Sequence, residues 1–384
     1  MRGFLYIVGF VLLLIVTNVG CGEETPPPST DVVSLTDIPY NPTAWSVTLP
    51  DGWPQLEVPA DNPMTDEGIN LGRHLFYDKL LSADGSQSCA SCHDPTLSFT
   101  DGKAVSAGID GITGSRSAMS LVNIGLLQPT PSNNEGVLFW DGRSRSLEEQ
   151  ALLPVEDPIE LHNEWPTVVK DLQESELYQE LFRKAFGIAD TDGITKELAA
   201  KAIAQFERSL LSYNSPFDIW DRLEGILTDD QLDGYYRFID DDGEVPFNKQ
   251  MECSHCHSLP TTTSSDFANN ALQPAETLED FTDVGRGAVT SIADNGKMRV
   301  PTLRNIMLTA PYMHDGRFET IEEVIDHYTS GGHFSPNASP FIRDAATPGK
   351  KNFSEQDKLF MKAFLESLTD TVFLNDPAIQ NPFQ

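Results

Sequence analysis

The sequence contains the pentapeptide pattern C-x-x-C-H twice, at residues 89–93 and at residues 253–257. In this pattern two thiols add across the two vinyl groups of a haem, and the adjacent imidazole ligates the iron from one side. A zinc half-site or a redox dithiol would also use two such cysteines, but zinc needs a further Cys or His pair at ligand spacing near each copy, and the sequence has none. The pattern therefore predicts two covalently bound c-type haems. The predicted attachment residues are Cys89, Cys92, His93, Cys253, Cys256 and His257.

A second group of residues that could take part in chemistry lies between the two motifs and includes Trp140, Gln150 and Glu160. Taken alone, Trp140 is equally well a core aromatic, and Glu160 equally well a solvated carboxylate in an acidic run. A haem that cleaves peroxide needs a base that takes a proton from the bound oxygen and returns it to the leaving one, which a carboxylate can do. A neutral amide such as Gln150 could hold peroxide without competing for the iron.

Four segments carry short motifs: LGR at 71–73, the run at 138–160, FERS at 206–209, and the stretch at 300–328 that begins VPTLRNIMLTAPYMHDGRF. Together they resemble the bacterial di-haem cytochrome c peroxidase and MauG family, and the similarity spans about residues 59–370.

This resemblance implies a division of labour between the two haems. The N-terminal haem, on His93, would react with peroxide, and the C-terminal haem, on His257, would store electrons. Trp140 would lie between them as a relay. The residues implied to form the peroxide pocket are Glu160 as acid/base, with Gln150 and Pro154 on the distal side.

Within the family, axial ligands divide the members. Many of the peroxidases carry a His after the first motif that blocks the first iron until the second haem is reduced, and this sequence has Ile109 there. The same peroxidases place a Met on the second iron, and the matching position here is Tyr328. Both differences resemble the MauG-like branch, so we expect an open first haem and a tyrosine ligand on the second.

Helical spacing supports the tyrosine ligand independently of the resemblance. Apolar residues within 321–328 recur at i, i+3 and i+4, and Tyr328 continues their face at i+7. His327 lies about 100° round the helix from that stripe, so it should face outward. Met313 and His314 are rival ligands, since Met is a common c-type partner.

Two positions depart from the family pattern. MauG has a second Trp just before the second motif, whereas Met251 stands here. The family's inter-domain calcium is held by an Asn side chain after an Arg and by carbonyl groups that match Thr309 and Pro311. Here Ser117 follows Arg116 at the Asn position, and a hydroxyl is a weaker calcium ligand than an amide carbonyl.

The elements that position these residues read as helices joined by long loops, because no segment shows convincing strand alternation. We expect a mostly α fold with two cytochrome c-like domains, at 59–215 and 216–384, each around one haem, and a hinge at 214–216. The acidic turn at 240–243 lacks the other ligands of an EF-hand and is read as solvated. The expected helices cover 66–80, 147–153, 166–186, 196–212, 228–239, 321–328 and 353–368.

The chain is strongly acidic, with 26 Lys and Arg against 58 Asp and Glu, a net charge of −32. This charge argues against nucleic acid and against electrostatic attachment to anionic lipid, and it favours a basic or weakly charged partner. At 384 residues the chain has room for two domains of ordinary size.

The N-terminus has the form of an export signal. One positive charge precedes an apolar stretch at 4–16 that is too short to span a membrane, so residues 1–20 are predicted to be a signal peptide. Cys21 follows directly and resembles the lipidated cysteine of bacterial lipoproteins, although Asn18 stands where that pattern prefers Leu. The alternative is a plain cleaved signal with a spectator cysteine. We expect residues 21–58 to form a lipoprotein stalk and a strap over the first domain.

These observations predict a periplasmic, lipid-anchored di-haem enzyme that reduces hydrogen peroxide. Its electrons would come either from a small donor protein, a cytochrome c or a cupredoxin, or from side chains of a partner protein. The rival hypothesis is a di-haem cytochrome that only transfers electrons. An open first haem with an acid and an amide over it speaks against that rival, because an electron carrier is normally six-coordinate at both irons.

Overall fold

The computed structural model describes residues 32–127, 136–239 and 243–384. The predicted signal peptide, Cys21, the first part of the stalk and most of the acidic turn at 240–243 lie outside these ranges. Within them, no helix is both long enough and apolar enough to cross a membrane.

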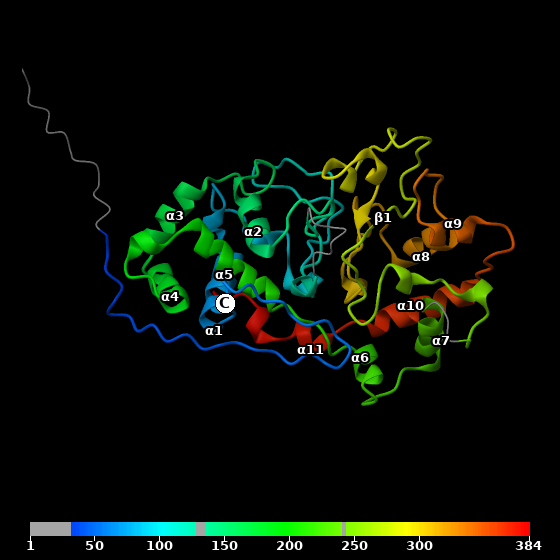
Figure 1. Ribbon diagram of the computed structural model, residues 1–384, viewed down its shortest axis with the longest axis horizontal. Helices are drawn as coiled ribbons and strands as arrows, with labels where there is room; N and C mark the ends of the chain where they lie inside the picture. The colour runs from blue at the N-terminus through cyan, green and yellow to red at the C-terminus, as the bar shows by residue number, and fades with distance from the viewer. Residues whose placement is uncertain (1–31, 128–135, 240–242) are drawn as a thin grey trace, which may run out of the picture.

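Helices make up nearly all of the regular secondary structure in the described part of the chain, as the sequence predicts, with long loops between them (Figure 1). The only strands in it form one antiparallel pair, with Phe267 opposite Arg299 and Ala268 opposite Met298. The helices are α1 (Asp66–Tyr77), α2 (Leu147–Glu156), α3 (Trp165–Glu174), α4 (Glu176–Phe186), α5 (Lys196–Arg208), α6 (Pro216–Asp221), α7 (Asp229–Phe238), α8 (Ile321–Ser330), α9 (Pro340–Ala346), α10 (Glu355–Ser367) and α11 (Thr371–Leu374), and the strands are β1 (Phe267–Ala268) and β2 (Met298–Arg299).

The prediction of one continuous helix at 166–186 was wrong. The expected single helix at 166–186 is two helices, α3 and α4, which meet at Ser175. Ser175 adopts an extended conformation, with φ −87° and ψ 115°, and ends the first helix while beginning the second. Serine competes poorly for helix interiors, and the apolar pattern on both sides masked this break.

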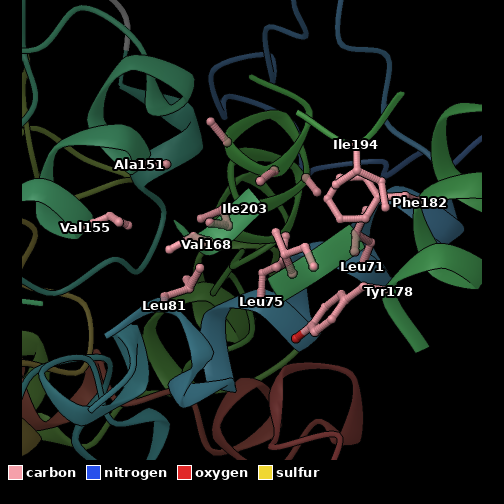
Figure 2. Close-up of a cluster of buried hydrophobic side chains, with 14 of the residues drawn as sticks. Leu71, Leu75, Leu81, Ala151, Val155, Val168, Tyr178, Phe182, Ile194 and Ile203 are labelled. Atoms are coloured by element: carbon pink, nitrogen blue, oxygen red, sulfur yellow. The ribbon is translucent and has the colours of Figure 1, made fainter. Parts of the chain in front are cut away.

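The N-terminal half is built on the crossing of α1 and α5, against which α2 and α4 also pack. A side chain at Gly72 would collide with the backbone of Ala202, so glycine allows the two helices to approach closely. The first core cluster fills the space beside this crossing, and Figure 2 shows Leu71 and Leu75 of α1 among side chains from the neighbouring helices. This core fixes α2 and α5, both of which line the first haem cavity described below.

The C-terminal half repeats this arrangement with different helices. There α7 packs on α10, and Gly234 allows their close approach because a side chain there would meet the Phe360 carbonyl group. Buried Phe238, Phe364 and Ile325 belong to the second core, which holds α8 in place beside the second motif.

Both ends of the described chain run across the molecule. The N-terminal strap bonds to the first half through Leu35, whose N–H donates to the Ala189 carbonyl, and continues to Trp53, whose ring lies 5.1 Å from the Arg304 guanidinium. The C-terminal segment returns to α1 (Figure 1), where the Tyr77 hydroxyl donates to the Ile379 carbonyl at 2.6 Å. The sequence had predicted a strap over the first domain. In the structure the strap also reaches Arg304, which belongs to the second half.

A buried ion pair supports α6 at the junction between the two halves. Arg304 is fully buried and donates to the Asp218 carboxylate at 2.6 Å, and Asp218 also caps α6 through Ser215. Asp218→Ala should lower the free energy of unfolding by about 3–5 kcal/mol, because it removes the carboxylate that is paired with the buried Arg304 charge. Denaturant unfolding of the haem-loaded protein measures this, with Asp171→Ala at an exposed position of α3 as the control. Equal losses in both variants would contradict a specific role for the pair.

Candidate functional site

The first motif forms one tight helical turn, in which the amides of Cys92 and His93 both donate to the Cys89 carbonyl. Nδ1 of His93 donates to the Phe99 carbonyl at 2.9 Å, so Nε2 remains for the iron. Burial lowers the pKa of His93, which keeps the imidazole neutral and able to ligate. Neither Cys89 nor Cys92 is in a disulfide. The residues present therefore fit covalent haem attachment.

The second motif has the same geometry. Nδ1 of His257 lies 3.0 Å from the Pro301 carbonyl and 3.2 Å from that of Thr262, and burial lowers its pKa to about 4. Cys253 and Cys256 are also free thiols. Both motifs thus present one ring nitrogen to a cavity, with the other fixed by backbone oxygen.

The first cavity brings together the residues that the sequence singled out for peroxide chemistry. Gln150 and Pro154 on α2, and Glu160 in the turn after it, line the same cavity as His93. Helix α2 begins at the Ser146 cap, and its end is fixed by the Leu161 amide, which donates to the Pro154 carbonyl.

Glu160 is half-buried in this wall. Burial raises the pKa of its carboxyl group, and the nearby Asp157 carboxylate raises it further, while Arg143 opposes both. A carboxyl group with a raised pKa can exchange protons nearer to neutral pH than an ordinary glutamate.

The loop at 106–114 packs against Glu160 and forms part of the wall of the same cavity. The Ile109 amide donates to the Glu160 carbonyl at 3.0 Å, and a side chain at Gly108 would collide with the Ile159 and Glu160 backbone. An isoleucine at this position offers the iron no ligand atom.

The second cavity is lined by His257 together with all three candidate distal ligands, Tyr328, Met313 and His314. Tyr328 on α8 and Met313 both line it, and the Asn270 side-chain amide donates to the Tyr328 hydroxyl and to the Met313 sulfur, each at 3.4 Å. Burial raises the pKa of Tyr328 to about 12, so without a metal the phenol is protonated. The structure places the predicted ligand and one of its rivals side by side.

The prediction that His327 faces outward was wrong. Its side chain is buried, and Nε2 donates to the Asn270 carbonyl at 2.9 Å. The apolar stripe predicted only part of the buried surface of α8. The loop that carries Asn270 also packs on the adjacent side of the helix, where His327 lies. His314, the other rival ligand, is also buried and lies edge-on to Trp140 with ring centroids 6.2 Å apart.

Two side chains line both cavities: Trp140 and Arg299. The Trp140 indole N–H donates to the Ser117 carbonyl at 2.9 Å, and the Arg299 amide donates to the Trp140 carbonyl at 2.8 Å. Trp140 therefore occupies the wall between the cavities, where the resemblance had implied a relay.

Arg299 is a functional candidate that the sequence analysis missed. It is 4% exposed, its Nε has no hydrogen-bond partner, and burial lowers its pKa to about 10. Its Nη2 donates to the Met119 sulfur at 3.4 Å. A buried guanidinium that borders two cavities fits the propionate groups of haems. The signal in the sequence was a lone arginine directly before the VPTLRN motif, but only tertiary structure shows that no described Asp or Glu pairs with it.

The calcium site implied by the resemblance does not fit this chain well. The Ser117 hydroxyl donates to the Met313 carbonyl at 2.9 Å, and its amide donates to the His314 carbonyl at 2.7 Å. The neighbouring Arg116 forms ion pairs with Asp141 and Asp283. The residue at the family's Asn position therefore bonds directly to backbone carbonyl groups, and the cationic Arg116 precedes it in the sequence.

Chelation should therefore leave the protein unchanged. Prolonged treatment with EDTA, followed by gel filtration, should alter neither the haem spectra nor peroxide turnover, because direct hydrogen bonds already join these segments. The matched variant Ser117→Asn restores an amide carbonyl and should raise calcium affinity in calorimetric titration. Loss of activity in the chelated wild-type protein, restored by calcium, would contradict this assignment.

Comparisons with known proteins point to one family. The family described as "Di-haem cytochrome c peroxidase" matches residues 66–225. The methylamine utilization protein MauG of Methylorubrum extorquens is 34% identical over 314 residues, which are 81% of this chain and 80% of that protein. The cytochrome c551 peroxidase of Nitrosomonas europaea is 34% identical over 278 residues, 71% of this chain and 76% of that one.

A solved structure supports the same conclusion about the fold. A MauG-like protein associated with microbial copper homeostasis superposes with a TM-score of 0.74 at 33% identity, covering 89% of this chain and all (100%) of that one.

Proposed function

The chain belongs to the di-haem cytochrome c peroxidase family, and we propose that it reduces hydrogen peroxide at the His93 cavity with electrons relayed through the His257 cavity. The reaction converts one hydrogen peroxide, two electrons and two protons into two waters. A haem bound at His93 would supply the iron that binds peroxide and takes part in electron transfer.

The single observation that carries this proposal is the shared cavity of His93, Gln150 and Glu160. In it, Glu160 accepts the proton of the bound oxygen and returns it to the leaving oxygen. The Gln150 amide holds peroxide by hydrogen bonding and is neutral, so it leaves the iron accessible. The Ile109 position supplies no blocking ligand, so the site is open without prior reduction.

The electron path runs through the wall between the cavities. Trp140 borders both, and its indole is fixed by Ser117, so it is held in one orientation for relay. Tyr328 would hold the iron of a haem bound at His257, and an anionic oxygen ligand favours higher iron oxidation states. This suits a haem that shares oxidising equivalents with its neighbour, as in the MauG-like branch.

Two electron sources fit this site, and they define two physiological roles. A small cytochrome c or cupredoxin as donor would make the protein a peroxide scavenger, and the net charge of −32 favours a basic or weakly charged donor. Side chains of a partner protein as donor would make it a protein-modifying oxidase.

Low-temperature EPR of the isolated ferric protein tests the proposal. We expect one high-spin and one low-spin signal, both lost on addition of one equivalent of peroxide without prior reduction. Two low-spin signals that ignore peroxide would contradict it and would favour an electron-transfer cytochrome instead.

We also propose that the protein is periplasmic and held to a membrane through lipid on Cys21, with no other membrane attachment. Cys21→Ala should move the protein from the membrane fraction to the soluble periplasmic fraction while haem content stays the same. An unchanged membrane fraction would show that Cys21 is not the anchor.

A further inference from the structure

Glu207 is a buried acid beside the first haem cavity to which no role has been given above. It lies in the last turn of α5, one turn after Ile203, and both side chains line the cavity of His93. Glu207 is 5% exposed, and its Oε2 has no hydrogen-bond partner. Burying an unpartnered carboxylate is costly unless the group is protonated.

The charged groups around Glu207 do not neutralise it. The adjacent Arg208 donates to the Glu148 carboxylate at 2.9 Å and to the Ala204 carbonyl at 3.3 Å, so its guanidinium is engaged elsewhere. Burial raises the pKa of Glu207 to about 8, Arg208 lowers it, and Glu148 raises it. Glu160 and Arg299 face the same cavity from other segments.

Glu207 and the first thiol of the motif, Cys89, line the same cavity. A haem attached through Cys89 would therefore share its cavity with Glu207. The charge of Glu207 would act on the haem in a wall that water does not screen.

We propose that Glu207 is a redox-linked proton site of the N-terminal haem. When one electron enters the haem, one proton from solvent converts the Glu207 carboxylate to the acid, and when the electron leaves, that proton is released. The inference rests on haem attachment at Cys89 and goes beyond peroxide turnover. The proton that Glu207 releases when the haem is oxidised enters the first cavity. The reduction of one peroxide in that cavity consumes two protons.

The sign of the effect follows from charge. The reduced haem carries one positive charge fewer, so the Glu207 acid is stabilised and its proton affinity is higher in the reduced state. Between the pKa values of the oxidised and reduced states, the midpoint potential falls as pH rises. A tenfold difference in proton affinity corresponds to about 59 mV for one electron, and we expect a total fall of at least that size.

EPR-monitored potentiometry of the haem-loaded protein, repeated from about pH 6 to about pH 9, tests the proposal. The wild-type N-terminal haem should show the pH-dependent fall, Glu207→Gln should abolish it, and Glu207→Asp should retain it. The C-terminal haem of the same molecules is the internal control, and its potential should not change. No peroxide is present, so the result is independent of whether the protein is a peroxidase.

Two results would overturn the proposal. One is a Glu207→Gln protein whose pH dependence matches that of the wild type. The other is a pH dependence that persists in Glu207→Gln and vanishes in Glu160→Gln, which would assign the proton to Glu160. If Glu207→Gln does not fold, redox-difference infrared spectroscopy of the wild type decides, because a protonated carboxyl band must appear on reduction.

Discussion

Glu160→Gln should lower the rate of peroxide turnover by about 10²–10⁴-fold, while both haem spectra stay as in the wild type. The substituted amide keeps the size of the side chain and its place in the cavity wall, but it cannot accept a proton from bound peroxide. Stopped-flow mixing of the ferric protein with peroxide measures the effect, and unchanged ligand binding at the first iron confirms that the cavity is intact.

The matched control is Glu156→Gln, an exposed carboxylate at the end of α2, which should react at the wild-type rate. The pH dependence gives a second check. Glu160 has a raised pKa, and its protonated form cannot act as the base. The wild-type rate should therefore fall, as pH decreases, at a pH above the ordinary glutamate value of 4.5. A Glu160→Gln protein with wild-type turnover would remove this residue from the mechanism.

Tyr328→Phe should change the coordination of the C-terminal haem alone. The variant removes the phenol oxygen and keeps the ring in place on α8, so the low-spin EPR signal should be lost or replaced while the N-terminal signal persists. The potential of the C-terminal haem should rise by on the order of 0.1 V, part of the ~0.8 V range that axial ligands control, because an anionic oxygen no longer stabilises ferric iron.

Met313→Leu is the decisive control, because Asn270 holds Met313 and Tyr328 side by side in the second cavity. If Tyr328 is the ligand, Met313→Leu should leave the low-spin signal unchanged. A spectrum that changes in Met313→Leu and not in Tyr328→Phe would transfer the ligand role to Met313.

The chemistry of haem attachment was readable in the sequence because it depends on local spacing. A thiol, two residues, a second thiol and an imidazole form one helical turn, and both copies adopt it. The mostly helical fold was predictable for the same reason, since apolar periodicity over ten or more residues reflects which face is covered. The family resemblance then named Glu160, Gln150 and Trp140, and the structure places them on the walls of the cavities.

Tertiary structure decided what depends on contacts between distant segments. His327 is buried because the loop that carries Asn270 covers the side of α8 outside the apolar stripe. Arg299 and Glu207 look like ordinary charged residues in the sequence, and only folding shows that each is buried with an unpartnered atom. Ser117 likewise bonds to Met313, nearly two hundred residues away. The spacing of residues along the chain is enough to form the C-x-x-C-H turn. The desolvation that shifts the pKa of a buried charged group arises only when separate elements pack around it.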